Sequence, residues 1–172
     1  MSANTTPFAD LNLVEHPEGG RFAEYYRSAA TVTTARGERP AGTAIYYSLN
    51  PSEISAFHRL AHDELWCWHA GGVIRLHIIA PDGSYRTVDL GEGKGAEQYA
   101  TTVHAGCWFG AECFQAPTLV SAIVVPGFDF LDFELASRST LLKEFPHLST
   151  IVERLTAQEY HSPTHRNNTE DS

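Results

Sequence analysis

Turn residues divide most of this chain into short segments with the composition of β-strands. Between Arg21 and Leu135, Gly and Pro recur throughout, and the segments between them are rich in β-branched and aromatic residues, which favour strands. This pattern predicts an all-β barrel or sandwich, and closing the barrel would hide the sheet edges and leave a central cavity. Residues 31–40 are predicted to be a loop, and the strands are predicted at 21–28, 43–49, 73–80, 84–90, 99–104, 107–114, 119–125 and 128–135.

Helical spacing appears only after Ser137. Apolar residues recur three and four positions apart from Leu141 to Leu155, and Pro146 interrupts the series. Two short C-terminal helices are therefore predicted, the second beginning near Ser149. Residues 161–172 are polar and are predicted to be a disordered tail, which leaves a single predicted domain over residues 1–160.

The charge balance limits the partners that this surface can attract. The 172 residues include 21 acidic and 12 basic side chains, and the net charge of −9 argues against a nucleic acid or an anionic membrane as a partner. Cys67, Cys107 and Cys113 form no CxxC or zinc-binding spacing, so a reducing, cytoplasmic location is expected. No targeting segment is recognised, and no apolar run approaches the length of about 20 residues that a membrane-spanning helix needs.

The densest group of chemically active side chains lies in residues 55–72, SAFHRLAHDELWCWHAGG. Every second side chain along a strand points to the same face, so His58 points to one face of its strand, and Glu64 and Trp66 share one face of the following strand. If the connection between the strands preserves this facing, an imidazole and a carboxylate project into one cavity. Such a pair suits metal binding or proton transfer.

Seven separate blocks of the sequence resemble the marks of one protein family. In chain order they are HPEGG (16–20), EYYRS (24–28), TAIYY (43–47), FHR (57–59), DELW (63–66), AGCWFG (105–110) and PGFDF (126–130). Together they resemble the cupin superfamily, and within it the branch with an HPEGG opening, the fifth cupin family, whose function is largely unknown. The resemblance implies a double-stranded β-helix, or jelly-roll barrel, with a small-molecule pocket inside, and it implies a homodimer.

The chain departs from the general cupin pattern at two positions that usually hold a metal. His58 and Glu64 match the first cupin motif, but Leu60 stands where that motif has its second histidine. Phe109 stands where the second motif has a histidine. Two of the four usual ligands are therefore missing, so a divalent metal ion held by His58 and Glu64 alone would bind weakly, unless His62 or His104 supplies a third ligand. The candidate metal ligands are His58, Glu64, His62 and His104.

The candidate catalytic and binding residues are polar or aromatic side chains that could face such a pocket. A histidine changes its charge near neutral pH and a carboxylate nearby raises its pKa, so the pair is suited to acid–base catalysis, or else braces the barrel. Hydroxyls, guanidinium groups and aromatic rings supply donors, a positive fork and stacking surfaces, and packing is the alternative for each. The predicted catalytic residues are His58, Glu64, Tyr46 and Tyr26, and the predicted ligand-binding residues are Arg27, Arg75, Trp66, Trp68, Trp108 and Phe109.

Three functions are compatible with these observations. The first, by analogy with other cupins, is an isomerase or epimerase that acts on a small polar metabolite, carbohydrate-derived or acidic. The second is a non-catalytic protein that binds or stores a small ligand. The third, a metal-dependent dioxygenase, is disfavoured by Leu60 and Phe109. The HPEGG segment is predicted to be a turn, with a role for Glu18 in the pocket or at a dimer contact as the weaker alternative.

Overall fold

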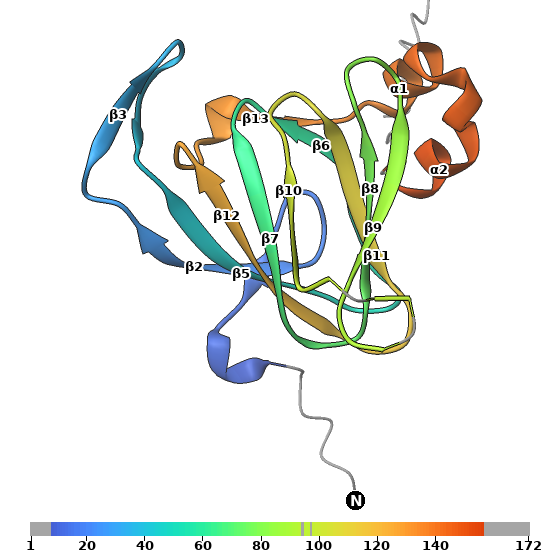
Figure 1. Ribbon diagram of the computed structural model, residues 1–172, viewed down its shortest axis with the longest axis horizontal. Coiled ribbons are helices and arrows are strands. Elements are labelled where there is room, and N and C mark those ends of the chain that lie inside the picture. The colour runs from blue at the N-terminus through green and yellow to red at the C-terminus, as the bar shows by residue number, and fades with distance from the viewer. Residues whose placement is uncertain (1–7, 94, 97, 157–172) are drawn as a thin grey trace, which may run out of the picture.

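The computed structural model describes residues 8–156 apart from 94 and 97, and in them two β-sheets enclose a common core (Figure 1). The predicted tail, residues 161–172, lies outside the described residues. The strands are β1 (Val14–Glu15), β2 (Arg21–Arg27), β3 (Thr31–Thr34), β4 (Gly37–Pro40), β5 (Thr43–Leu49), β6 (Ile54–Leu60), β7 (Asp63–Gly71), β8 (Ile74–Ile79), β9 (Tyr85–Leu90), β10 (Ala100–Val103), β11 (Trp108–Cys113), β12 (Thr118–Val125) and β13 (Phe133–Leu135).

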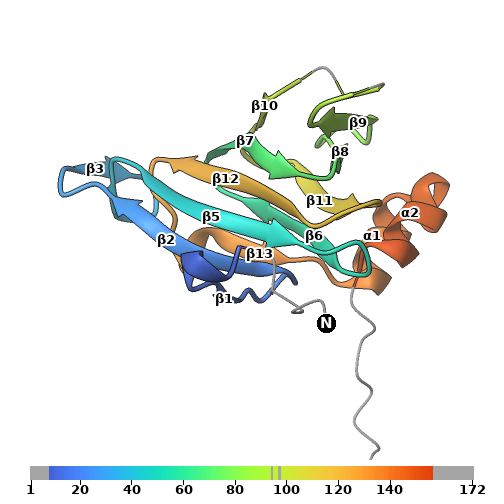
Figure 2. The ribbon, with the colours of Figure 1, turned by 90° about the horizontal axis from the view of Figure 1, so that it is seen from below.

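The strand order is that of a jelly roll. A six-stranded sheet has the order β1-β2-β5-β12-β7-β10, and a five-stranded sheet has the order β13-β6-β11-β8-β9. The chain crosses repeatedly from one sheet to the other, as it does from β5 to β6 and from β6 to β7. Figure 2 shows the resulting two layers. The predicted all-β jelly-roll fold with short C-terminal helices is confirmed.

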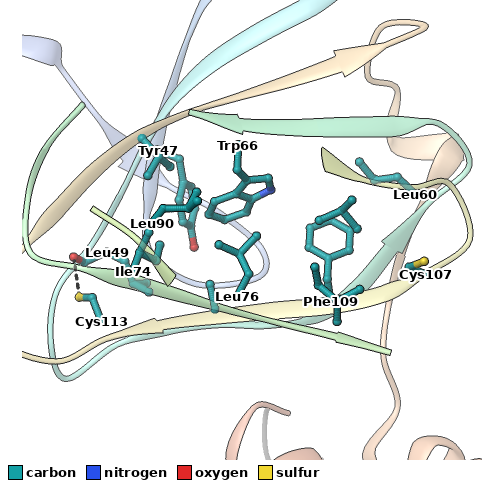
Figure 3. Close-up of a cluster of buried hydrophobic side chains, with 14 of the residues drawn as sticks. Tyr47, Leu49, Leu60, Trp66, Ile74, Leu76, Leu90, Cys107, Phe109 and Cys113 are labelled. Carbon is teal, nitrogen blue, oxygen red and sulfur yellow. Dashed lines mark hydrogen bonds between the residues drawn. The ribbon is translucent and has the colours of Figure 1, made fainter. Parts of the chain in front are cut away.

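Side-chain alternation along the strands builds the core. Tyr47 and Leu49 of β5 are fully buried between the sheets, and Trp66 of β7 and Phe109 of β11 meet them from other strands. Figure 3 shows these rings pointing into the space between the sheets. Burying one such large side chain contributes roughly 1.5–3 kcal/mol, which holds the two layers together.

The helices cover the outer face of the five-stranded sheet. Helices α1 (Arg138–Glu144) and α2 (Ser149–Arg154) flank a 3₁₀ turn, η3 (Pro146–Leu148), where the proline prevents a continuous helix. A second apolar cluster joins them to the sheet, with Phe57 and Trp108 packed against the helices. No helix in the described part of the chain has the length and apolar character needed to cross a membrane.

The predicted loop at residues 31–40 is instead the β3–β4 hairpin. The β-branched run before Ala35 favours a strand, and Gly37 takes the positive φ of +105° that follows the turn. The Thr34 hydroxyl donates to the Gly37 carbonyl at 2.7 Å and closes the turn. The polar composition of this segment reflects its exposure rather than a lack of strand structure.

The predicted strand at residues 128–135 begins later than expected. Residues Phe130–Asp132 form a 3₁₀ turn, η2, and only Phe133–Leu135 pair as β13. The Asp129 side chain accepts a hydrogen bond from the Leu131 amide at 2.8 Å, which favours the turn over an extended chain. This turn brings Phe130 and Phe133 to the edge of the barrel interior.

Candidate active site

A cavity of about 250 Å³ lies between the two sheets. Its walls come from the inner faces of β2, β5, β6, β7 and β12, and the segments around residues 16–18 and 128–133 complete them. Aromatic and aliphatic side chains make up most of the lining. The lining residues are His16, Glu18, Phe22, Glu24, Arg27, Thr43, Ile45, Tyr47, His58, Leu60, Glu64, Trp66, Ala122, Val124, Phe128, Asp129, Phe130 and Phe133.

His58 and Glu18 form the polar centre of this cavity. His58 Nε2 lies 3.1 Å from Glu18 Oε2, and the side chains are 2% and 7% exposed. The Ser55 hydroxyl donates to Glu18 Oε1 at 2.8 Å. Burial raises the pKa of the Glu18 carboxyl and lowers the pKa of the His58 imidazole, because each charged form loses its hydration. Burial therefore favours protonation states in which the His58–Glu18 pair has no net charge.

The hydrogen bonds of His58 determine where its protons lie. Nδ1 is 2.8 Å from the carbonyl oxygen of Ala56, and a carbonyl only accepts, so Nδ1 carries a hydrogen. The contact between Nε2 and Glu18 Oε2 then needs one more proton between the two atoms. Without it, a nitrogen lone pair would face a carboxylate oxygen. The pair consequently holds one transferable proton.

Glu64 supplies a second buried carboxyl to the same cavity. Its Oε2 accepts a hydrogen bond from Trp66 Nε1 at 2.9 Å. Burial raises the pKa of the Glu64 carboxyl to about 7, with His58 opposing the shift and Glu18 adding to it. A carboxyl group that titrates near neutral pH can take up and release a proton under physiological conditions.

A tight turn over residues 16–20 carries Glu18 into the cavity. The Ala56 amide donates to the Glu18 carbonyl at 2.8 Å, which attaches the turn to β6. Gly19 and Gly20 have φ values of +105° and +67°, in the region that favours glycine. A Cβ on Gly19 would overlap the Ile54 carbonyl oxygen. Only glycine therefore allows the turn to lie this close to the barrel.

His16 and Tyr47 support this turn from either side. The Glu18 amide donates to His16 Nδ1 at 3.3 Å, so His16 is the neutral tautomer with its hydrogen on Nε2. Burial lowers the pKa of the His16 imidazole and preserves this neutral form. The Tyr47 hydroxyl donates to the Gly19 carbonyl at 2.8 Å. Both side chains line the cavity as well as holding the turn.

The entrance to the cavity carries an arginine that is already paired. Arg27 Nε and Nη2 donate to the two carboxylate oxygens of Glu24 at 2.9 and 2.7 Å. This hydrogen bonding raises the pKa of the Arg27 guanidinium, and the negative charge of Asp129 adds to the effect. The walls behind it are aromatic, with Phe128 in edge contact with Phe130 and Phe133.

Four of the predicted site residues line the cavity, namely His58, Glu64, Trp66 and Arg27. Phe109 packs on His58 with 4.1 Å between ring centroids, but it belongs to the core beside the cavity.

The two predicted catalytic tyrosines lie outside the cavity. Tyr46 is on the outer face of the six-stranded sheet, where its ring is 4.3 Å from that of Tyr25, and Tyr26 is 53% exposed. The strand period of two explains the difference, since Tyr47 and not Tyr46 shares the inner face with Thr43 and Ile45.

Three predicted ligand-binding residues also lie away from the cavity lining. Trp68 Nε1 donates to the Gly72 carbonyl at 3.1 Å. Trp108 is buried under the C-terminal helices, with the Arg59 guanidinium 4.4 Å from its ring. Arg75 forms an ion pair with Asp89 at 2.7 Å on the outer face of its sheet. Each of the three has a local structural partner.

The predicted metal ligands do not converge. His62 Nδ1 is 3.7 Å from Asp132, and His104 is 73% exposed beside Asp63. Both lie away from the cavity lining, while Leu60 occupies part of it. Among the described residues, no group of three or more His, Cys, Asp or Glu side chains is placed to hold a metal ion. The described side chains therefore do not fit a protein-held divalent ion, and they provide no ligand set for an iron-dependent oxygenase.

Three cavity residues are hard to recognise in the sequence: Glu18 had only a weak case there, and His16 and Tyr47 were not among the predicted site residues. The signal for Glu18 and His16 was the HPEGG segment, in which two titratable residues stand beside paired glycines. The signal for Tyr47 was the alternation of Thr43, Ile45 and Tyr47.

Comparison with known proteins places this geometry among related chains. Residues 7–136 match the family model described as "Cupin superfamily (DUF985)". The chain is 31% identical over 141 residues to the uncharacterized protein YML079W of Saccharomyces cerevisiae, a match that covers 72% of this chain and 70% of the yeast protein.

Two solved structures resemble it closely. A hypothetical protein from Leishmania major has a TM-score of 0.82 and 35% identity, covering 87% of this chain and 96% of the other. Protein SO0799 from Shewanella oneidensis has a TM-score of 0.82 and 36% identity, covering 91% and 99%.

More distant solved structures share the fold alone. They include a dTDP sugar isomerase from Desulfovibrio desulfuricans, with a TM-score of 0.50 and 15% identity over 67% of this chain and 83% of the other. An oxalate decarboxylase from Bacillus subtilis has a TM-score of 0.55 and 16% identity, and the match covers 86% of this chain and 37% of the decarboxylase.

Proposed function

This chain belongs to the cupin superfamily, in its DUF985 family, and from that membership and the geometry of its cavity we propose that it is an acid–base enzyme of the isomerase or epimerase type. The observation that carries the proposal is the 3.1 Å contact between His58 Nε2 and Glu18 Oε2. Both residues line the same cavity as Glu64, whose carboxyl group has a pKa of about 7. Two groups that titrate differently in one cavity provide an acid and a base.

The proposed reaction moves a proton on a small hydroxylated carbonyl compound. Ionised Glu64 takes a proton from the carbon next to the carbonyl group, and the electron pair of that C–H bond becomes the C=C bond of an enol. The Glu18–His58 pair gives its proton to the carbonyl oxygen. For isomerisation, Glu64 then gives its proton to the former carbonyl carbon, and the Glu18–His58 pair takes the proton of the neighbouring hydroxyl group, which restores both groups. For epimerisation, Glu64 returns its proton to the opposite face of the original carbon after the bound enol has turned over, and the Glu18–His58 pair takes back the enol proton. Each positioned group contributes about 10²–10⁴-fold to the rate.

The fold supports this reaction class by analogy. A dTDP sugar isomerase has the same fold at low identity, although that likeness says nothing by itself about the substrate of this chain. The aromatic rings of Phe22, Trp66 and Phe133 provide apolar faces on which a sugar ring or another flat group can stack.

Hydrogen exchange into a panel of simple sugars tests the proposed proton transfer. The protein is incubated in D₂O with unphosphorylated aldoses and ketoses, and NMR follows deuterium incorporation at the carbon next to the carbonyl group. We expect incorporation above background with at least one compound, and a loss of about 10²-fold or more in both Glu64→Gln and Glu18→Gln. Glu134→Gln, which removes an exposed carboxylate paired with Arg59, serves as the matched control.

A non-catalytic ligand-binding protein is the second candidate. The observation that favours it is the mainly apolar lining of the cavity, in which Leu60 stands at the position of the second histidine of the general cupin motif. Deuterium incorporation that is equal in wild type, Glu64→Gln and Glu18→Gln, together with saturable binding of a small molecule, would favour this candidate and overturn the first.

A further inference from the structure

Two polar atoms in the cavity wall have no protein partner within the part of the chain that the structure describes. Trp66 contacts only Oε2 of Glu64, which leaves Oε1 without a donor. His16 accepts a hydrogen bond at Nδ1, and its Nε2–H has no protein acceptor in the same set of residues. Both side chains line the cavity, so a bound molecule can reach them.

The positive groups of the cavity are already committed. The Arg27 fork is held by both carboxylate oxygens of Glu24. His58 donates from Nδ1 to the Ala56 carbonyl, and its Nε2 faces Glu18. A carboxylate or phosphate that entered the cavity would therefore find no guanidinium or imidazolium ready to neutralise it.

The acidic groups, in contrast, outnumber the fixed cation. Glu18, Glu24, Glu64 and Asp129 all line the cavity, and Arg27 is the fixed cation among its lining residues. Glu24 is compensated by Arg27, whereas Glu18 and Glu64 are buried beside neutral donors. Glu18 shares a proton with His58, so the carboxylate left to repel an entering anion is ionised Glu64, and an entering ammonium group would find an acceptor in the same Glu64.

The aromatic walls add to this preference. Trp66 and Phe133 line the cavity beside Phe22, and the face of an aromatic ring attracts a cation within about 6 Å of its centre. The cavity volume of about 250 Å³ exceeds the 150 Å³ or so that holds a benzene ring, so a small molecule with one ring and one polar group fits.

We infer that the cavity selects a ligand whose buried end is a protonated amine or a neutral hydrogen-bond donor, and that it rejects a carboxylate or phosphate at that position. This inference rests on the cavity of the proposed function and narrows its substrate class to amine-bearing or uncharged compounds. Glu64 Oε1 is the acceptor for that group, and His16 Nε2–H donates to an oxygen of the same ligand.

Three probes of nearly equal shape test the inference. Benzylamine, benzyl alcohol and benzoate differ mainly in charge, and at about pH 8 they are cationic, neutral and anionic. Binding to the full chain is measured by NMR titration. We expect benzylamine to bind at least about 10-fold more tightly than benzoate, with benzyl alcohol between them. Glu64→Gln should reduce the affinity for benzylamine to that for benzyl alcohol, and Glu134→Gln should leave all three affinities unchanged.

Equal or tighter binding of benzoate by the wild type overturns the inference, and so does failure of both benzylamine and benzyl alcohol to bind at millimolar concentration. The comparison within the wild type does not depend on whether a variant folds. It is also independent of turnover: a charge preference without deuterium exchange overturns only the proposed reaction, and exchange without the charge preference overturns only the substrate class.

Discussion

Two buried imidazole–carboxylate pairs lie on opposite faces of the five-stranded sheet. His58 of β6 faces the cavity and contacts Glu18, whereas His77 of β8 faces the C-terminal helices and contacts Glu112. Both histidines are 2% exposed. The pairs have the same residue types and similar burial, so their differences come from what surrounds them.

The His77–Glu112 pair has a complete set of partners. His77 Nε2 donates to Glu112 Oε1 at 2.9 Å, and the Tyr85 hydroxyl donates to His77 Nδ1 at 2.6 Å. Arg154 of α2 donates to the same Glu112 oxygen at 2.7 Å. Arg154 thus places a fixed positive charge beside Glu112, and the network joins α2 to the sheet.

The His58–Glu18 pair has neutral donors and an open side. Ser55 and not an arginine contacts Glu18, and the cavity lies beside it. An arginine partner therefore gives the His77–Glu112 pair a structural role. The His58–Glu18 pair has no arginine partner, so the proton between its two groups can be transferred. Variants of both pairs and of their neighbours test this contrast, and the expected changes decrease in the order given below.

Glu112→Ala should lower the free energy of unfolding by about 3 kcal/mol, because it leaves the buried His77 donor without its acceptor, while the Arg154 guanidinium, 53% exposed, can bind water instead. Denaturant unfolding followed by circular dichroism measures the change. Glu18→Gln, which keeps an acceptor for Ser55, should cost about 1 kcal/mol or less. Equal losses of unfolding free energy in the two variants would contradict the distinction between a structural His77–Glu112 pair and a proton-donating His58–Glu18 pair.

Glu64→Gln should stabilise the protein by roughly 3 kcal/mol at pH 8 and leave its stability unchanged at pH 4. The folded-state pKa of about 7 is above the unfolded value of 4.5, so the folded state binds more protons between these values. The contribution of Glu64 to wild-type stability therefore falls as the pH rises from 4.5 to about 7, and the variant lacks this contribution.

Unfolding measured across that pH range checks the sign. The Trp66 indole retains an acceptor in the variant, because the glutamine carbonyl replaces Oε2. A difference between wild type and variant that stays constant from pH 4 to pH 8 would contradict the raised pKa of the Glu64 carboxyl.

Tyr85→Phe should lower the free energy of unfolding by about 1 kcal/mol, since His77 Nδ1 loses its donor while Glu112 keeps both of its own. Nitrogen NMR of the His77 ring supplies the specific signal, because the Nδ1 resonance should move while Nε2 stays protonated. An unchanged ring spectrum would show that the tyrosine is not part of the network.

Glu134→Gln should change stability by less than about 0.5 kcal/mol. Its ion pair with Arg59 measures 2.7 Å, but the Arg59 and Glu134 side chains are 41% and 54% exposed, so water screens the interaction. Thermal unfolding at low and high salt measures the effect. A loss comparable to that in Glu112→Ala would mean that burial does not separate the two kinds of ion pair.

Local sequence patterns were sufficient for an all-β barrel or sandwich with C-terminal helices and for part of the cavity lining, whereas the jelly-roll topology followed from the family resemblance. The alternation in residues 43–49 and 119–125 and the helical spacing after Ser137 identify elements that the structure contains. His58 and Glu64 were also found, because they lie on consecutive strands whose facing follows from the period of two.

The remaining site residues depend on contacts that no local pattern contains. Glu18 reaches His58 from a turn 40 residues away in the sequence, and only the path of that turn across β6 brings them together. The choice of Tyr46 over Tyr47 missed the inner face of β5 by one position. The missed residues have the same chemical types as the predicted ones, but their position at the site depends on contacts between segments that are distant in the sequence.

The paired glycines of the turn have a practical meaning for anyone who redesigns this protein. The backbone of Gly19 and Gly20 places Glu18 in contact with His58. Phe22, Ile45 and Val124 form part of the wall of the adjoining cavity. Directed evolution can therefore vary these wall residues to accommodate new ligands, provided that positions 19 and 20 remain glycine. A methyl group added at Gly19 would collide with the Ile54 carbonyl oxygen of β6 and move Glu18 away from His58.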